Sequence, residues 1–328
     1  MIEVSAPANI AFIKYWGKEK TELDLERNFA TNPSLSMTLS QARTLTTAKL
    51  HGDCDHFILN EEVLKESSAD YLKIQKHKKR IFEFFQLEEK NIFIKTKNNF
   101  PQAAGIASSA SAYASLSIAM AGVILGKEKF EELYTQDKSI FSNLSRRGSG
   151  SACRSLSPFY CYWDGKESQK TLNYKMKLLD SIVIFSKERK KVSSSKGHLF
   201  AQESPFFKNR IESNLPRRIT EIQKALENDN FHQFGQLLEE EAYEMMKIMK
   251  ENPNSIDYTN TETKSFLRHL KTLPKKRDFY FTIDAGANPH IISLKNVETE
   301  LQSILKLLEI EAEIWKDHCG SGPRWNYL

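Results

Sequence analysis

A loop of small residues joins a short apolar segment to an alanine-rich one, and its sequence is Phe100-Pro101-Gln102-Ala103-Ala104-Gly105-Ile106-Ala107-Ser108-Ser109. Residues 91–96 before it are apolar and β-branched, which predicts a strand. The residues after it, to about Leu125, favour a helix. Because Pro and Gly punctuate the segment between them, the sequence predicts a strand, a turn and the start of a helix in succession.

The start of a helix is a natural place for an anion. Its first backbone N–H groups have no partner within the helix, and the helix dipole adds positive potential there. Ser108 and Ser109 add hydroxyl donors, so a triphosphate would fit. No Gly-Lys-Ser/Thr follows the glycine, which excludes a P-loop of the Walker type. From these residues alone, an ordinary capped helix remains the alternative.

Strands and helices elsewhere are mixed and do not alternate strictly. Apolar spacing of three and four residues predicts a helix at 68–87, and the basic run 76–80 within it is expected to form its solvated face, with an anion patch as the alternative. We predict an α+β fold, divided at a polar, basic segment into residues 1–186 and 187–328. The other expected strands are 10–13, 36–39, 44–50, 181–185, 279–283 and 310–315, and the other expected helices lie within 208–250 and at 297–309.

Composition narrows the class of protein. Hydrophobic residues make up 40% and charged residues 27% of 328, values typical of a globular protein of about two domains. The formal net charge of +5 is too small to indicate nucleic-acid binding and favours a small anionic ligand. No apolar run approaches the ~18 residues of a membrane span, and no signal peptide is expected. The four scattered cysteines indicate reduced thiols and a cytoplasmic location.

Two further segments could carry chemistry. The small residues Gly148-Ser149-Gly150-Ser151 could form an anion-binding nest, and Arg154 follows with a planar fork suited to a carboxylate or phosphate. Asp284 ends the apolar strand at 279–283, a good position for a general base. The alternatives are a surface arginine beside a flexible loop, and an Asx turn that closes the strand.

A polar and aromatic cluster lies near the N-terminus and consists of Asn9, Lys14, Tyr15, Trp16, Gly17 and Lys18. The two lysines could bind phosphate as point charges, or they could face water while the aromatic rings pack at the edge of the core. Histidines without a metal-binding spacing argue against a zinc enzyme, and no complete Gly-x-Ser-x-Gly elbow supports a serine hydrolase.

Taken together, these segments resemble the diphosphomevalonate decarboxylases, a family of the GHMP small-molecule kinase superfamily. The match follows family order across nearly the whole chain, with departures at Pro33, at Ala287 and within 19–28. It rests on Asn9-Ile10-Ala11-Phe12-Ile13-Lys14-Tyr15-Trp16-Gly17-Lys18, Asn32-Pro33-Ser34-Leu35-Ser36-Met37-Thr38-Leu39, Ala103-Ala104-Gly105-Ile106-Ala107-Ser108-Ser109-Ala110, Gly148-Ser149-Gly150-Ser151-Ala152-Cys153-Arg154-Ser155 and Thr282-Ile283-Asp284-Ala285-Gly286-Ala287-Asn288, with Val192-Ser193-Ser194 as a weaker sixth segment.

The resemblance implies an N-terminal domain of the ribosomal protein S5 domain 2 type, a ferredoxin-like C-terminal domain and a site between them. It implies ATP-dependent decarboxylation of (R)-5-diphosphomevalonate to isopentenyl diphosphate, with Mg²⁺ as cofactor, no nucleic-acid or membrane partner, and a homodimer. A phosphomevalonate decarboxylase and a mevalonate-type kinase are the alternatives within the superfamily, and a non-catalytic nucleotide-binding protein is the alternative from another class.

The resemblance also assigns roles to residues. Asp284 would accept or orient the hydroxyl proton, and Arg154 would hold the carboxylate. Ser194 is the third residue expected in catalysis. The substrate would be held by Tyr15, Lys18, Lys14, Ser149, Ser151 and Arg154, and the ATP phosphates by Ala104, Gly105, Ala107, Ser108, Ser109 and Lys190, with the metal held by phosphates rather than by protein ligands.

Overall fold

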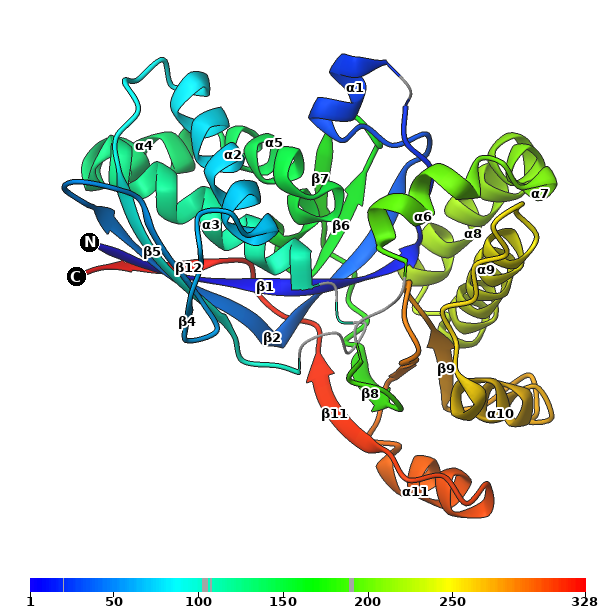
Figure 1. Ribbon diagram of the computed structural model, residues 1–328. Coiled ribbons are helices and arrows are strands. Elements are labelled where there is room, and N and C mark those ends of the chain that lie inside the picture. The colour runs from blue at the N-terminus through cyan, green and yellow to red at the C-terminus, as the bar shows by residue number, and fades with distance from the viewer. Residues whose placement is uncertain (20, 102–105, 107, 189–191) are drawn as a thin grey trace.

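Two β-sheets that share a buried core organise the chain (Figure 1). The computed structural model describes residues 1–19, 21–101, 106, 108–188 and 192–328. Ala104, Gly105, Ala107 and Lys190, all expected to bind the nucleotide, lie outside the described residues.

The larger sheet, eight-stranded over the described residues, has the order β12-β1-β2-β5-β3-β4, and β6 and β7 extend it from β2. Its neighbours are antiparallel except β3 and β5, which are parallel. The strands expected at 36–39 and 44–50 are parts of the single long strand β2. The strands are β1 (Ile2–Ile13), β2 (Ser34–Leu50), β3 (His56–Leu59), β4 (Glu62–Val63), β5 (Ile92–Asn98), β6 (Tyr160–Trp163), β7 (Gln169–Leu172) and β12 (Arg324–Tyr327).

Helices cover one face of this sheet (Figure 1). The central one, α3 (Ser108–Leu125), packs directly on β1 and β2. The helix expected at 68–87 is α2 (Ala69–Phe84), whose N-cap Ser68 accepts a hydrogen bond from the Tyr71 N–H. The remaining elements of this half are α1 (Glu22–Arg27), α4 (Lys127–Gln136), α5 (Lys138–Gly148) and a 3₁₀ helix, η1 (Gly150–Leu156).

Two expectations about this half are wrong in part. Helix α3 is long and apolar enough, by length and composition, to cross a membrane, although no such run was expected. It is a core helix, because 61% of that window is buried inside the protein. In α2, Lys76 and Lys79 are exposed as expected, but His77 and Lys78 are buried. Lys78 tolerates burial because Asp55 and Glu89 pair with it at 2.6 and 2.9 Å.

The smaller sheet, four-stranded over the described residues, has the antiparallel order β11-β8-β10-β9. Numbered by their order along the chain, β8, β9, β10 and β11 are strands 1, 2, 3 and 4, so the order across the sheet is 4-1-3-2. This is the ferredoxin-like order, and it confirms the expected α+β class. The strands are β8 (Leu179–Ile184), β9 (Phe279–Thr282), β10 (His290–Ser293) and β11 (Glu313–His318).

The helices of the second half surround this sheet. Helices α10 and α11 pack against residues of its strands in one apolar cluster, to which α9 also contributes Ala242. Helices α8 and α9 also pack into the cluster that joins the two sheets. The helices are α6 (Ser194–Ala201), α7 (Pro205–Asn209), a π-helical turn (Arg210–Asn214), α8 (Leu215–Glu227), α9 (Phe231–Lys250), α10 (Thr261–Leu270) and α11 (Glu298–Leu307).

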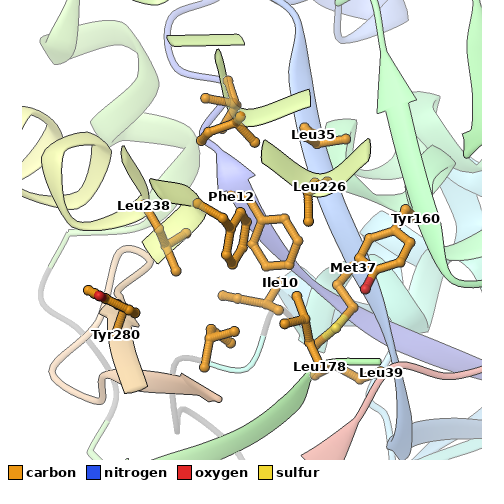
Figure 2. Packing of buried hydrophobic residues seen from close by; sticks show 14 of the residues in the cluster. Ile10, Phe12, Leu35, Met37, Leu39, Tyr160, Leu178, Leu226, Leu238 and Tyr280 are labelled. Atoms are coloured by element: carbon orange, nitrogen blue, oxygen red, sulfur yellow. The ribbon is translucent and has the colours of Figure 1, made fainter. Parts of the chain in front are cut away.

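A continuous apolar cluster joins the two sheets. Figure 2 shows Ile10 and Phe12 of β1 among residues of β2, α8, α9 and the second sheet. Phe12 meets Phe234 edge to face, with ring centroids 4.9 Å apart. The division at residue 186 stays a prediction: the chain enters the second sheet with β8 and returns to the first with β12. Because the core is shared, residues just beyond β1 are held against those just beyond β9.

Candidate active site

The end of β1 meets the end of β9 through an ion pair. Lys14 follows β1, and its Nζ lies 2.5 Å from Oδ1 of Asp284, two residues beyond β9. The Asp284 side chain keeps 24% of its exposure, so it can still meet a ligand. Desolvation by itself would raise the pKa of Asp284, but Lys14, with His290 and Arg154 further away, holds it below the usual aspartate value. Asp284 is therefore an ionised carboxylate at neutral pH.

Arg154 belongs to η1 and is buried, with 3% of its surface exposed. Its Nε and Nη2 donate to Oδ1 of Asn9 at 3.2 and 3.0 Å, and its Nη1 donates to Oγ of Ser34 at 2.9 Å. Among the described residues no carboxylate lies within ion-pair distance of it. A buried guanidinium held only by neutral acceptors still needs a counter-charge, and a ligand carboxylate would supply it.

Asn9 fixes the orientation of this guanidinium. The pairing of β1 with β2 is irregular between Pro7 and Asn9, and such bulges re-aim side chains next to sites. The Asn9 Nδ2 donates to Oγ of Ser155 at 2.8 Å and to the Ser151 carbonyl at 3.2 Å, which leaves Oδ1 toward Arg154. Neither Asn9 nor Ser34 was predicted as a site residue; an asparagine inside an otherwise apolar strand was the available signal.

Tyr15 lies between Arg154 and helix α6. The Arg154 Cζ is 5.5 Å from the centroid of the Tyr15 ring. Burial raises the pKa of Tyr15 to about 12, so its hydroxyl keeps its proton and can donate. A Cβ at Gly150 would come within 2.7 Å of that hydroxyl, so this glycine lets the backbone of η1 approach the ring.

Helix α6 packs on the same aromatic pair. His198 stacks on Tyr15, with ring centroids 4.4 Å apart and planes at 20°, and lies 4.2 Å from the Trp16 ring. The Ser193 side chain caps the helix by accepting from the Lys196 N–H. Ser194, expected in catalysis, is the first residue of α6. His198 was not predicted.

Serines from two elements meet opposite this helix. Oγ of Ser109, in the first turn of α3, lies 3.2 Å from Oγ of Ser149, which is 3.3 Å from Oγ of Ser151. Ser108 is the first residue of α3. The two predicted anion-binding segments, one at the start of α3 and the other at 148–151, are therefore neighbours.

Lys18 lies further along the same loop as Tyr15. Its Nζ donates to Oδ1 of Asn28 at 2.9 Å, and burial lowers the pKa of Lys18 below the usual lysine value. The described residues place no carboxylate within ion-pair distance of Lys18. Like Arg154, it is a partly desolvated cation held by a neutral acceptor.

A cluster of paired charges lies directly behind Lys14. Glu241 Oε1 accepts from the Lys14 backbone N–H at 2.8 Å, and Arg210 donates to the Lys14 carbonyl at 3.0 Å. Arg210 and Arg218 both pair with Glu241 at 2.5 Å and with Glu244 at 2.6 and 2.7 Å. This cluster fixes the backbone that carries Lys14, and its charges are neutralised within the protein.

A metal held by the protein itself would need several His, Cys, Asp or Glu side chains close together. The described residues contain no group of three His, Cys, Asp or Glu side chains that could hold a metal. Asp284 is engaged by Lys14. Mg²⁺ accepts phosphate oxygens and water readily, so these residues fit an ion carried by nucleotide phosphates.

Comparison with known proteins identifies the family of this chain. Residues 6–173 match the model of the diphosphomevalonate decarboxylase-like N-terminal domain, and residues 181–322 match that of the mevalonate 5-diphosphate decarboxylase C-terminal domain. The chain belongs to the diphosphomevalonate decarboxylase family. The diphosphomevalonate decarboxylase of Candida albicans is 31% identical over 96% of this chain and 90% of its own length.

Solved structures share the whole fold. The mevalonate diphosphate decarboxylase of Staphylococcus aureus is 26% identical, with a TM-score of 0.84 over 100% of this chain and 99% of its own. The structure of MDDEF in complex with MVAPP, AMPPCP and magnesium is 24% identical, with the same TM-score of 0.84 over 100% of this chain and 99% of its own. At that identity the likeness supports the fold alone. The expected GHMP-kinase-like architecture is confirmed.

Proposed function

We propose that this member of the diphosphomevalonate decarboxylase family converts (R)-5-diphosphomevalonate and ATP into isopentenyl diphosphate, ADP, phosphate and CO₂. The observation that carries the proposal is Arg154, a buried guanidinium that has no carboxylate partner among the described residues and lies near both Tyr15 and the ionised Asp284. A decarboxylase must hold a carboxylate next to the group that orients its hydroxyl, and these two side chains supply both functions.

Asp284 acts on the tertiary hydroxyl of the substrate. Hydroxide is a poor leaving group, so the oxygen must first receive the γ-phosphoryl group of ATP. Because Lys14 keeps Asp284 ionised, the carboxylate accepts a hydrogen bond from that hydroxyl, aims its lone pair and takes its proton as the phosphoryl group transfers. Lys14 was predicted to bind substrate; we now assign it to Asp284.

Arg154 holds the carboxylate through the second stage. When the tertiary phosphate departs, positive charge develops on the carbon, and the electrons of the C–CO₂⁻ bond form the new double bond. A fork fixed by Asn9 and Ser34 keeps that bond aligned with the departing phosphate. Arginine suits this role because its charge persists and its two N–H groups match the two carboxylate oxygens.

The remaining hydrogen-bond donors of the site bind the diphosphate tail and the nucleotide. We assign Tyr15, Lys18, Ser149 and Ser151 to the tail, and the start of α3 with Ser108 and Ser109 to the ATP phosphates. Ser194 of α6 faces the phosphates in this proposal. The roles of Ala104, Gly105, Ala107 and Lys190 stay predictions. Mg²⁺, when bound, neutralises phosphate charge during transfer.

The proposal extends to the setting of the enzyme. The cytoplasmic location, expected from the scattered cysteines, and the homodimer, implied by the family resemblance, both stay predictions. Cys54, Cys153, Cys161 and Cys319 are all free thiols, which supports a reducing compartment. Sedimentation of the purified protein tests the dimer.

One assay tests the function. The purified chain is incubated with ATP, Mg²⁺ and (R)-5-diphosphomevalonate, and CO₂ and ADP are measured together. We expect the two products in equal amounts. ADP without CO₂ would identify a kinase, and turnover of the monophosphate but not the diphosphate would identify a phosphomevalonate decarboxylase.

A further inference from the structure

Asn28 connects two parts of the site that come from distant segments. It is the residue at which α1 ends, in the left-handed conformation with φ 53°. Its Oδ1 accepts from Nζ of Lys18 at 2.9 Å. Its Nδ2 donates to the carbonyls of Arg146 and Arg147 at 2.9 and 3.0 Å. The Asn28 side-chain amide therefore links the Lys18 ammonium to the C-terminal end of α5.

The orientation of this amide is dictated by its partners. An ammonium only donates and a backbone carbonyl only accepts, so exchanging the amide oxygen and nitrogen would break all three bonds. The Arg80 guanidinium also donates to the Arg147 carbonyl, at 2.7 Å, and helps to hold this end of α5 in place. The Asn28 oxygen is thus held rigidly beneath the Lys18 ammonium.

The position of Lys18 relative to the serines depends on that connection. Arg147 precedes Gly148, where α5 ends, and Ser149 and Ser151 follow within four residues. Within the described residues Lys18 has no carboxylate partner to hold it. A lysine side chain is long and flexible, so without Asn28 its ammonium would sample many positions. With Asn28 it is pre-set at a fixed position relative to the serine hydroxyls.

We propose that Asn28 is a positioning residue that confers preference for a diphosphate over a monophosphate tail by fixing Lys18 relative to Ser149 and Ser151. The inference rests on the proposed function, and in particular on Lys18 binding the tail. A diphosphate carries more negative charge and reaches further than a monophosphate, so it gains more from a cation held in place. Asn28 itself does not touch the reacting atoms.

A purely structural role for Asn28 can be separated from this one. Asparagine also suits the left-handed end of α1, where most side chains are strained. Asn28→Gly keeps that backbone conformation and removes only the amide. Asn60, with φ 48° in the turn between β3 and β4, offers a matched control, because Asn60→Gly makes the same change far from the site.

The test is a double-mutant cycle on KM. We expect Asn28→Gly to raise KM for diphosphomevalonate about tenfold, the value of one charge-assisted hydrogen bond, with kcat and KM for ATP little changed. The monophosphate should be affected less, so the preference for the diphosphate shrinks. Lys18→Ala should raise KM at least as much, and adding Asn28→Gly to it should change nothing further.

Contrary results are equally clear. If Asn28→Gly raises KM by the same factor with and without Lys18, or affects both substrates equally, the proposal is wrong. If the glycine variant does not fold, Asn28→Asp replaces it: aspartate tolerates the backbone but neutralises Lys18 and repels the two carbonyls, so KM should again rise selectively. An unchanged KM in that variant would overturn the proposal. A wild-type protein inactive on diphosphomevalonate would instead refute the proposed function.

Discussion

Arg154 and Arg210 are both buried arginines, but the protein treats their charges differently. Arg210 and its neighbour Arg218 share Glu241 and Glu244, so their charges are balanced within the fold. Among the described residues, Arg154 has the neutral Asn9 amide and Ser34 hydroxyl as its hydrogen-bond partners and no carboxylate. Removing charge from water costs several kcal/mol per ion, and only the first group recovers that cost from protein partners. Arg210 and Arg218 therefore stabilise the fold, whereas Arg154 is available to bind the substrate carboxylate.

The first prediction tests the anion next to this unpaired cation. Asp284→Asn keeps the shape but cannot accept the hydroxyl proton, so kcat should fall by about 10²–10⁴ while ATP binding survives. Steady-state CO₂ release and nucleotide titration measure the two effects. Asp278→Asn, at an exposed pair with Lys295, is the control and should keep wild-type activity. Near-full activity of Asp284→Asn would place the base elsewhere.

The second prediction tests the paired cluster. Glu241→Ala leaves Arg210 and Arg218 buried with reduced compensation, so the free energy of unfolding should fall by about 3–5 kcal/mol. Urea denaturation measures it. Glu240→Ala removes a half-exposed partner of Arg218 and should cost less than about 1 kcal/mol.

Arg154→Gln in the same denaturation assay should also cost less than about 1 kcal/mol, because the described residues give Arg154 no ion pair to lose and a buried charge is removed. If Arg154→Gln destabilised the fold as much as Glu241→Ala, the distinction between the two kinds of arginine would fail.

A third prediction concerns His77, a buried side chain that is uncharged in the folded protein at neutral pH. His77 is buried beside Ser117, and burial, with Arg80 and Arg147 nearby, lowers its pKa to about 3. The unfolded chain takes the proton near pH 6.5 and the folded chain only near 3, so stability falls as the pH drops through this window. At pH 5 the free energy of unfolding should be about 2 kcal/mol lower than at pH 7.

Urea denaturation at pH 7 and pH 5 measures this loss. His77→Gln should remove about that much of the pH dependence, whereas His51→Gln, at an exposed site, should leave it as in the wild type. An unchanged pH dependence in His77→Gln would mean that His77 is protonated in the folded protein.

The smallest expected effect is at the thiol next to Arg154. Burial raises the pKa of Cys153 to about 12 although Arg154 lies nearby, so the thiol stays protonated and unreactive. Activity should be the same with and without reductant, as measured by CO₂ release. Loss of activity under reducing conditions would show that a disulfide supports the site.

The sequence predicts local features of this molecule better than the contacts between distant residues. Apolar spacing of three and four residues was enough for α2, an apolar run was enough for β9, and the start of α3 was expected from the alanine-rich run. Asp284 was picked out by its place after a strand. Its partner Lys14 lies 270 residues away in the chain, and only the shared core brings the two together.

The same limit explains the residues that were missed. Asn9, Ser34 and Asn28 act by hydrogen bonds across the fold, and nothing in their local sequence shows which group they will meet. Lys78 was expected in water because its neighbours are basic, but its partners Asp55 and Glu89 come from other segments. Family resemblance located the segments of the site, while their mutual contacts required the three-dimensional structure.

The most direct test of the account is the rate of CO₂ release by Arg154→Gln. Glutamine cannot reproduce the fork, and misplacing reacting groups by about 1 Å can cost ~10² in rate. We predict a loss of at least about 10²-fold, with ADP falling in parallel because phosphoryl transfer needs the same orientation. CO₂ release at the wild-type rate would contradict the assignment of Arg154 to the substrate carboxylate.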